Sequence, residues 1–116
     1  GCQIKNGGSR DKMITIKDIK KWAKPHPATV FRSGNGKQAR FGNGKVEFSI
    51  VGGDIGLYGD FESTFEVAIF DMESRNFITR FFYPETSDDV ISYMSSDEVE
   101  NLVNSVVKRE DLSIEV

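Results

Sequence analysis

Residues 61–83, FESTFEVAIFDMESRNFITRFFY, decide the expected fold. Residues 61–70 and 77–83 are rich in aromatic and β-branched side chains, and the polar residues 71–76 separate them. This composition is typical of two strands joined by a turn. In the first segment apolar residues alternate with polar ones, so one face must be covered. We therefore predict a central β-hairpin with an apolar face.

A helix that can cover this face is predicted at residues 97–108. Ser95 or Ser96 can cap its first amides, and Asp97 and Glu98 suit the positive end of the helix dipole. Its apolar side chains recur at helical spacing and should pack on the hairpin. They are Val99, Leu102, Val103, Val106 and Val107.

Shorter elements are expected on either side of that helix. Residues 87–89 should open a helical turn that carries Val90, Ile91 and Met94. Residues 111–116 alternate like a last strand or form a frayed tail.

The first half of the chain predicts a short helix followed by a meander. Thr15 and Asp18 form a capping box, and Pro25 ends the helix. Its narrow apolar stripe consists of Ile16, Ile19, Trp22 and Ala23. Strands are expected at residues 28–33, 38–41 and 46–51. The tetrapeptide Gly-Asn-Gly-Lys occurs between them twice, at residues 34–37 and 42–45, and Asn-Gly favours type I′ hairpin turns.

These elements together predict one α+β domain. It comprises a short N-terminal helix, an antiparallel meander of about five strands, and C-terminal helices packed on one face of the sheet. The domain should span residues 14–116 and follow a flexible N-terminal leader of residues 1–13, because that segment has no apolar periodicity and contains the spacer Asn-Gly-Gly-Ser. The sequence has 116 residues, which is enough for one core and too few for two. No apolar run is long enough to span a membrane.

Charge is distributed unevenly, although the net charge is only −3. Residues 1–45 contain eleven basic and two acidic side chains, a net charge of +9, whereas residues 85–116 contain nine acidic and two basic ones, a net charge of −7. Such polarity is informative about partners rather than fold. The candidate basic surface comprises Lys17, Lys20, Lys21, Lys24, Arg32, Lys37, Arg40 and Lys45. The candidate acidic surface comprises Glu85, Asp88, Asp89, Asp97, Glu98 and Glu100.

Each charged surface has more than one interpretation. The basic residues could contact phosphates, could be solvated side chains that keep sheet edges apart, or could neutralise the acidic C-terminal region within the fold. The acidic residues could cap helices or could imitate nucleic acid. The sequence does not choose among these interpretations.

Catalytic and metal-binding chemistry has little support in the sequence. His26 is the only histidine and lies between two prolines, and neither a histidine pair nor a calcium-loop pattern is present. We therefore expect no catalytic residues, no metal site and no cofactor. An enzyme whose site is assembled from distant residues stays an alternative.

The single cysteine, Cys2, excludes an intramolecular disulfide and favours a cytoplasmic location. The alternative is a lipid anchor on Cys2 of a processed lipoprotein. The sequence thus predicts a non-enzymatic binding module with a charge-polarised surface that engages a protein partner. The alternative partner is nucleic acid, bound by the basic residues. Neither the partner nor the oligomeric state follows from the sequence.

Overall fold

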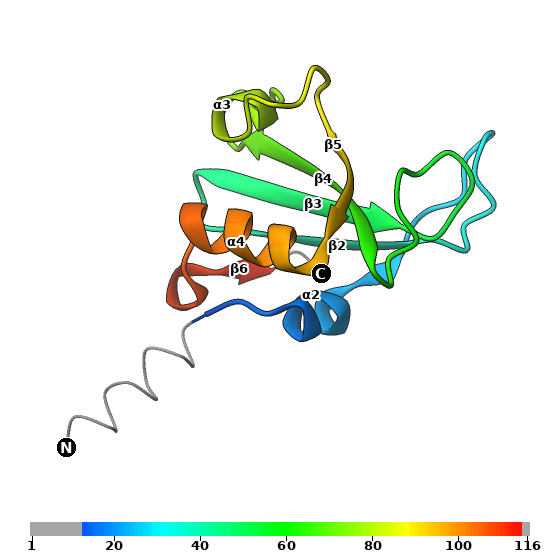
Figure 1. Ribbon diagram of the computed structural model, residues 1–116, viewed down its shortest axis with the longest axis horizontal. Coiled ribbons are helices and arrows are strands. Elements are labelled where there is room, and N and C mark those ends of the chain that lie inside the picture. Colours follow the sequence, from blue (N-terminus) through cyan, green and yellow to red (C-terminus); the bar gives the residue numbers. More distant parts are fainter. Residues whose placement is uncertain (1–12, 115–116) are drawn as a thin grey trace.

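A six-stranded antiparallel sheet organises the computed structural model, which describes residues 13–114 (Figure 1). The strands follow the order β1–β2–β3–β4–β5, and β6 pairs with β2 on the edge that β1 also uses. The strands are β1 (Lys24–Pro25), β2 (Lys37–Gly42), β3 (Val46–Gly52), β4 (Thr64–Asp71), β5 (Ile91–Ser95) and β6 (Ser113–Ile114). The helices are α2 (Ile16–Trp22), α3 (Thr79–Phe82), α4 (Ser96–Val106) and the 3₁₀ turn η1 (Arg109–Asp111). This arrangement confirms the predicted α+β class.

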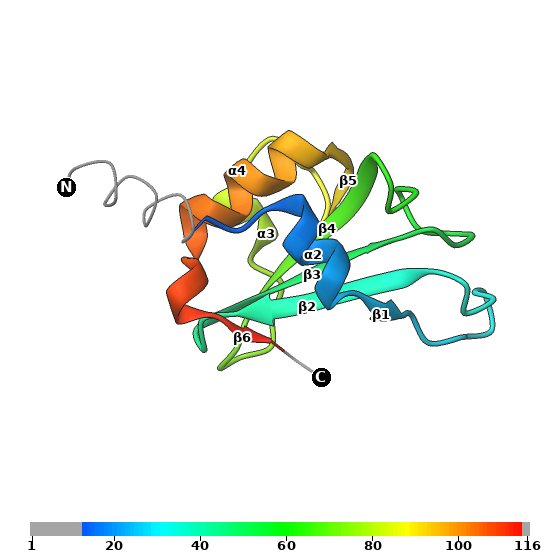
Figure 2. The same ribbon diagram turned by 90° about the horizontal axis from the view of Figure 1, so that it is seen from below.

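The core lies on one face of the sheet, beneath α2 and α4. Phe48 of β3 pairs with Phe41 of β2 and with Ile69 of β4, and all three are buried on this face. The buried residues Val99 and Val103 of α4 belong to the same core. Figures 1 and 2 show α4 lying across the sheet with α2 beside it. The prediction that the helix near residues 97–108 covers the aromatic face is therefore confirmed.

Both predicted helix starts are confirmed as capping boxes. The Thr15 hydroxyl accepts the Asp18 N–H at the start of α2, and the Ser95 hydroxyl accepts the Glu98 N–H at the start of α4. In each case the acidic side chain accepts the N–H of the capping residue in return. Since these contacts are local, the sequence pattern is sufficient to predict them.

Two polar side chains of α4 attach the chain that leads into α2. Asn104 accepts the N–H of Ile14 at 2.7 Å and donates to the carbonyl of Ile14 at 2.7 Å. Glu100 accepts the N–H of Ile16 at 2.6 Å. These hydrogen bonds hold the chain against α4 from Ile14 onward. Residues 1–12 of the predicted leader lie outside the described residues.

The predicted central hairpin is wrong in its second half. Residues 77–83 do not form a strand: Phe77 makes one bridge with Phe70, and the chain then turns into α3. The reason is competition for one edge of β4. Residues 77–79 take only its end, where the Thr79 hydroxyl accepts the Ile69 N–H at 3.0 Å, while β5 pairs with the rest. The partner that pairs continuously with residues 66–71 of β4 is β3, which precedes it and connects to it through the long loop of residues 53–63.

The helical turn predicted around residues 87–94 is also wrong, because this segment contains the edge strand β5. Ile91 and Met94 lie three positions apart, which suggested a helix. Tyr93 has a left-handed backbone, with φ 55°, and the β4–β5 register shifts between Phe65 and Val67. A bulge of this kind lets two residues three apart both be buried.

The predicted meander is correct for β2 and β3 and wrong for residues 28–33. That segment has only one bridge, between Thr29 and Arg32, because the two-residue β1 takes the edge of β2. The first Gly-Asn-Gly-Lys sequence therefore does not connect two paired strands.

The second tetrapeptide joins β2 to β3, but not through a type I′ turn. Gly44 has a φ of 90°, whereas Asn43 does not have a positive φ. Instead, the Asn43 side chain accepts the N–H groups of Lys45 and Val46. The prediction underestimated the ability of an Asn side chain to form the turn itself.

Candidate binding surface at the loop end

Two long loops project together beyond one end of the sheet. They comprise residues 26–36, between β1 and β2, and residues 53–63, between β3 and β4 (Figures 1 and 2). We call these two loops the loop end. In Figure 1 they are the cyan and green loops on the right.

Asp54 joins the two loops. Its carboxylate accepts the Ser33 hydroxyl at 2.8 Å and the Gly34 N–H at 2.9 Å from the first loop, and the Ile55 N–H at 2.7 Å from its own loop. Partial desolvation, the largest single influence, raises the pKa of Asp54. The hydrogen bonds from Ser33, Ile55 and Gly34 outweigh it and lower the pKa to about 2. The carboxylate is therefore ionised at neutral pH and holds the loops together.

Asp60 fixes the other end of the second loop. Its carboxylate accepts the N–H groups of Glu62, Ser63 and Thr64 at 2.8–3.0 Å, and these bonds hold the pKa of Asp60 well below its usual range. A bond from the Gly53 N–H to the Gly59 carbonyl closes the same loop. The loop is thus held by internal hydrogen bonds even though it has no regular secondary structure.

Three apolar side chains at the loop end lie in solvent. The exposed fractions are 92% for Val30, 85% for Phe31 and 79% for Ile55. Single exposed apolar residues are ordinary, but a group of them on one projecting end is typical of interaction sites. Residues 28–33 were predicted as a strand, so this exposure was missed. These residues are exposed because no neighbouring strand pairs with the segment 28–33, and this can be seen only in the folded chain.

Tyr58 and Tyr93 lie beside each other where the second loop contacts β5. Their ring centroids are 6.0 Å apart, and the Tyr93 N–H donates to the Tyr58 carbonyl at 2.9 Å. Both tyrosines are partly exposed. They extend the apolar character of the loop end toward the sheet.

A cavity of about 230 Å³ lies at the base of the first loop. Three predicted basic residues line it: Lys20 of α2, Lys24 of β1 and Lys37 of β2. Its other walls are Ala23, Pro25 and the turn Gly34–Asn35–Gly36. We call this cavity the lysine pocket. It brings Lys20 of α2 next to the first glycine turn.

The remaining predicted basic residues are divided between different places. Lys17 and Lys21 are exposed on α2, and Lys45 is exposed on the β2–β3 turn. Arg40 forms an ion pair with Glu47 on the face of the sheet opposite the core. The Nε atom of Arg32 is buried without a hydrogen-bond partner among the described residues. The eight residues therefore do not form one surface.

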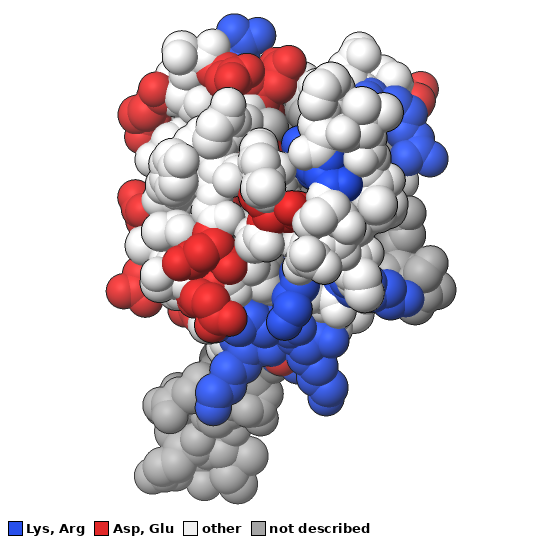
Figure 3. Space-filling model, turned by 90° about the vertical axis from the view of Figure 1, so that its right-hand side faces the viewer, with Lys and Arg blue, Asp and Glu red and all other residues white. Residues whose placement is uncertain are grey.

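Most of the positive and negative side chains gather in different parts of the loop end. Seen from that end, the largest group of Lys and Arg lies at the bottom and most Asp and Glu lie on the left, while smaller positive groups at the centre, top and upper right adjoin acidic side chains (Figure 3). Within residues 13–114, none of the six predicted lysines forms an ion pair with an acidic side chain. Direct neutralisation of these lysines by the C-terminal acids is thus not observed in this part of the chain.

The predicted acidic residues also separate into two groups. Asp97, Glu98 and Glu100 belong to α4, where Glu98 caps the helix and Glu100 binds the Ile16 N–H. Glu85, Asp88 and Asp89 were expected at a helix start but lie in the loop between α3 and β5. Asp89 is 3.9 Å from Arg80, at an exposed site.

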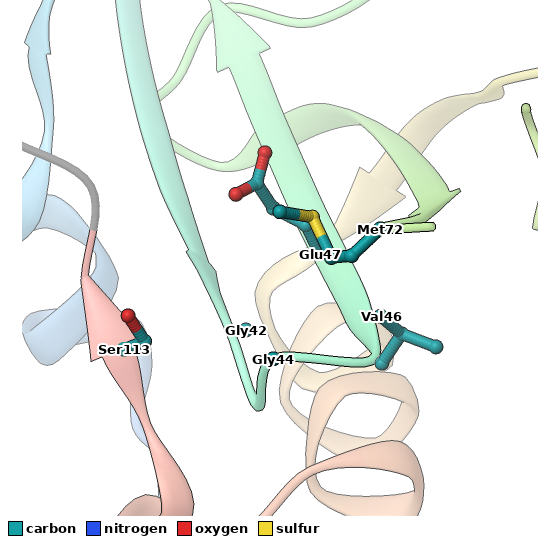
Figure 4. A pocket seen from close by; sticks show the side chains of 6 residues that line it. All are labelled: Gly42, Gly44, Val46, Glu47, Met72 and Ser113. Carbon is teal, nitrogen blue, oxygen red and sulfur yellow. The ribbon is translucent and has the colours of Figure 1, made fainter. Parts of the chain in front are cut away.

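In two other cavities the charged side chains already have hydrogen-bond or ion-pair partners. One lies between the two loops and is lined partly by Asp54 and Asp60, whose carboxylates already accept several hydrogen bonds. The other, about 190 Å³, lies at the far end of β2 and β3, where Figure 4 shows Glu47 and Met72 side by side. The Glu47 carboxylate already has Arg40 as its partner. The lysines of the lysine pocket, by contrast, form no ion pair within residues 13–114 and are available to bind a ligand.

Comparison with known proteins adds no assignment: no family model, curated protein or solved structure matches the chain. Among residues 13–114, no three His, Cys, Asp or Glu side chains are grouped to hold a metal ion. In the same range, none of the helices has the length and apolar character that crossing a membrane requires.

Proposed function

We propose that the protein is a non-enzymatic binding module that engages a protein partner through the loop end. The observation that supports the proposal is the exposure of Val30, Phe31 and Ile55 on loops that Asp54 and Asp60 hold in place. A rigid surface loses little conformational entropy on binding, and fully exposed apolar side chains gain the most from burial. The proposed binding site thus lies on loops that a rigid sheet supports, as in many binding proteins.

The test is affinity capture from lysate of the source cell, with and without nuclease. A variant with Val30→Ser, Phe31→Ser and Ile55→Ser removes the apolar tip, and Phe81→Ser, on the exposed helix α3, is the control. We expect a nuclease-resistant partner that the wild type and the control capture and the loop variant loses. Equal capture by all three proteins contradicts the proposal.

Nucleic acid is the second candidate partner, and the lysine pocket is the observation that favours it. Capture that disappears after nuclease treatment would favour this candidate. An enzymatic function stays a sequence-based alternative that no described cavity supports further.

A cytoplasmic location also belongs to this proposal, and the single cysteine supports it. Cys2 lies outside the described residues. Mass spectrometry of the N-terminal peptide from the native cell distinguishes an unmodified Cys2 from a lipid-anchored one.

A further inference from the structure

We propose that the lysine pocket binds a phosphate group of a single-stranded nucleic acid. The proposal does not rest on the protein partner, because the pocket is formed by other residues, and only Phe31 is shared with the apolar tip. It concerns Lys20, Lys24, Lys37 and the turn Gly34–Asn35–Gly36.

The electrostatics of the pocket favour an anion. Three lysines line it and no acidic residue does; the carboxylate of Asp54, beside its wall, is already bound to the Gly34 N–H and to Ser33, and three positive charges outnumber it. The Lys20 ammonium donates to the carbonyl of Glu62 at 3.0 Å, which is a contact with a neutral group. None of the three lysines has an ion-pair partner within residues 13–114. Their charges repel one another, and a bound anion relieves that repulsion.

The size of the pocket favours a small anionic group. Drug-sized ligands and cofactors occupy about 300–1,000 Å³, and this pocket has about 230 Å³. A phosphate group, bound by lysine ammonium groups as point charges, matches both the size and the charge.

The surroundings favour a phosphate that belongs to a strand. Lys17 and Lys21 are exposed on the same helix as Lys20 and can contact neighbouring phosphates. Phe31 is 85% exposed and lies three residues before Gly34, at most about 11 Å away along the chain. An unpaired base next to the bound phosphate can therefore stack on the Phe31 ring.

The shape of the site favours a single strand over a duplex. The pocket lies at the base of the projecting first loop, between that loop and α2. A flexible single strand can place one phosphate there and keep its bases unpaired for stacking, whereas the bases of a duplex are already stacked on each other.

The test uses the full chain and a fluorescent single-stranded oligonucleotide of 20 nucleotides, titrated between 50 and 300 mM salt. The pocket variant is Lys20→Gln, Lys24→Gln and Lys37→Gln. The control variant is Arg75→Gln, Arg80→Gln and Lys108→Gln, which removes the same charge at exposed positions elsewhere. Each phosphate contact with a single strand contributes about −0.7 to the slope of log K against log salt. We expect the pocket variant to lose at least about tenfold in affinity at 50 mM salt and about 0.7 in slope, which corresponds to one phosphate, and the control to lose less than about twofold.

The same titration with inorganic phosphate, followed by NMR, separates the two sources of phosphate. We expect both inorganic phosphate and the oligonucleotide to shift the amide resonances of residues 34–37. This measurement uses the wild type, so it stands even if the pocket variant does not fold. Phosphate binding without oligonucleotide binding would overturn the assignment to nucleic acid. Equal losses in both variants, or no shift at residues 34–37, would overturn the site itself.

Discussion

At the level of single residues, Asp54 is the side chain on which the loop end most depends. It connects Ser33 and Gly34 to a loop about twenty residues further along the chain. A Gly-Gly-Asp-Ile-Gly sequence is typical of a turn in which Asp binds its own neighbours, as Asp54 does with Ile55. The bonds to Ser33 and Gly34 have no sequence signal, because they depend on two loops meeting in space.

The contact between the loops should depend on pH through Asp54. Its pKa is lowered from the usual 3.8 to about 2 in the folded protein, so the ionised form is favoured by folding. The stabilisation is therefore complete above pH 3.8 and is lost as the pH falls through about 2. We expect the Gly34 and Ile55 amide resonances to titrate together with a midpoint near 2. Asp54→Asn should abolish this titration, and a midpoint at or above 3.8 in the wild type would contradict the described contact.

At the level of elements, α4 and α3 show two different outcomes of sequence prediction. The helix α4 has local caps and a clear apolar stripe, and it forms as predicted. The segment around α3 has strand-like residues but only part of one strand edge to pair with. Local helix propensity decided that α4 forms. Competition for one edge of β4 decided that the segment around α3 does not form a strand.

Leu102 tests whether α4 packs as described. Its side chain is 8% exposed in the core cluster, so Leu102→Ala should lower the free energy of unfolding by about 2–5 kcal/mol. Asn101→Ala, at the adjacent exposed position of α4, should change it by less than about 0.5 kcal/mol. Urea unfolding measures both variants. A loss below about 1 kcal/mol for Leu102→Ala would mean that α4 packs elsewhere.

Thr79 tests the contact that replaces the predicted strand. Its hydroxyl accepts the Ile69 N–H at 3.0 Å, and the residue is 1% exposed. Thr79→Val keeps the shape but leaves that N–H unpaired, so we expect a loss of about 1–3 kcal/mol of stability. Thr79→Ser keeps the hydroxyl and should lose less, although it removes a methyl group. If the valine variant is as stable as the wild type in urea unfolding, the hydroxyl contributes nothing to this edge.

At the level of the whole molecule, the fold places the unevenly distributed charged residues of the sequence on different ends and faces. Lys20 of α2 and the glycine turn meet at the base of the first loop, although more than ten residues separate them in the chain. Arg40, by contrast, faces Glu47 on the sheet and leaves the predicted basic surface. Net charge alone therefore did not identify the lysine pocket.

The sequence by itself determined the α+β class, both capping boxes, the strands β2 and β3, and the apolar stripe of α4. These features depend on residues that are neighbours along the chain, so their spacing carries the information. Tertiary structure alone decided the strand β5, the loss of the strand at residues 77–83, the Asp54 bridge and the lysine pocket. Each of these depends on which segment occupies a shared edge or meets a distant loop. That choice is made by packing and by competition for backbone hydrogen bonds, which local composition does not encode.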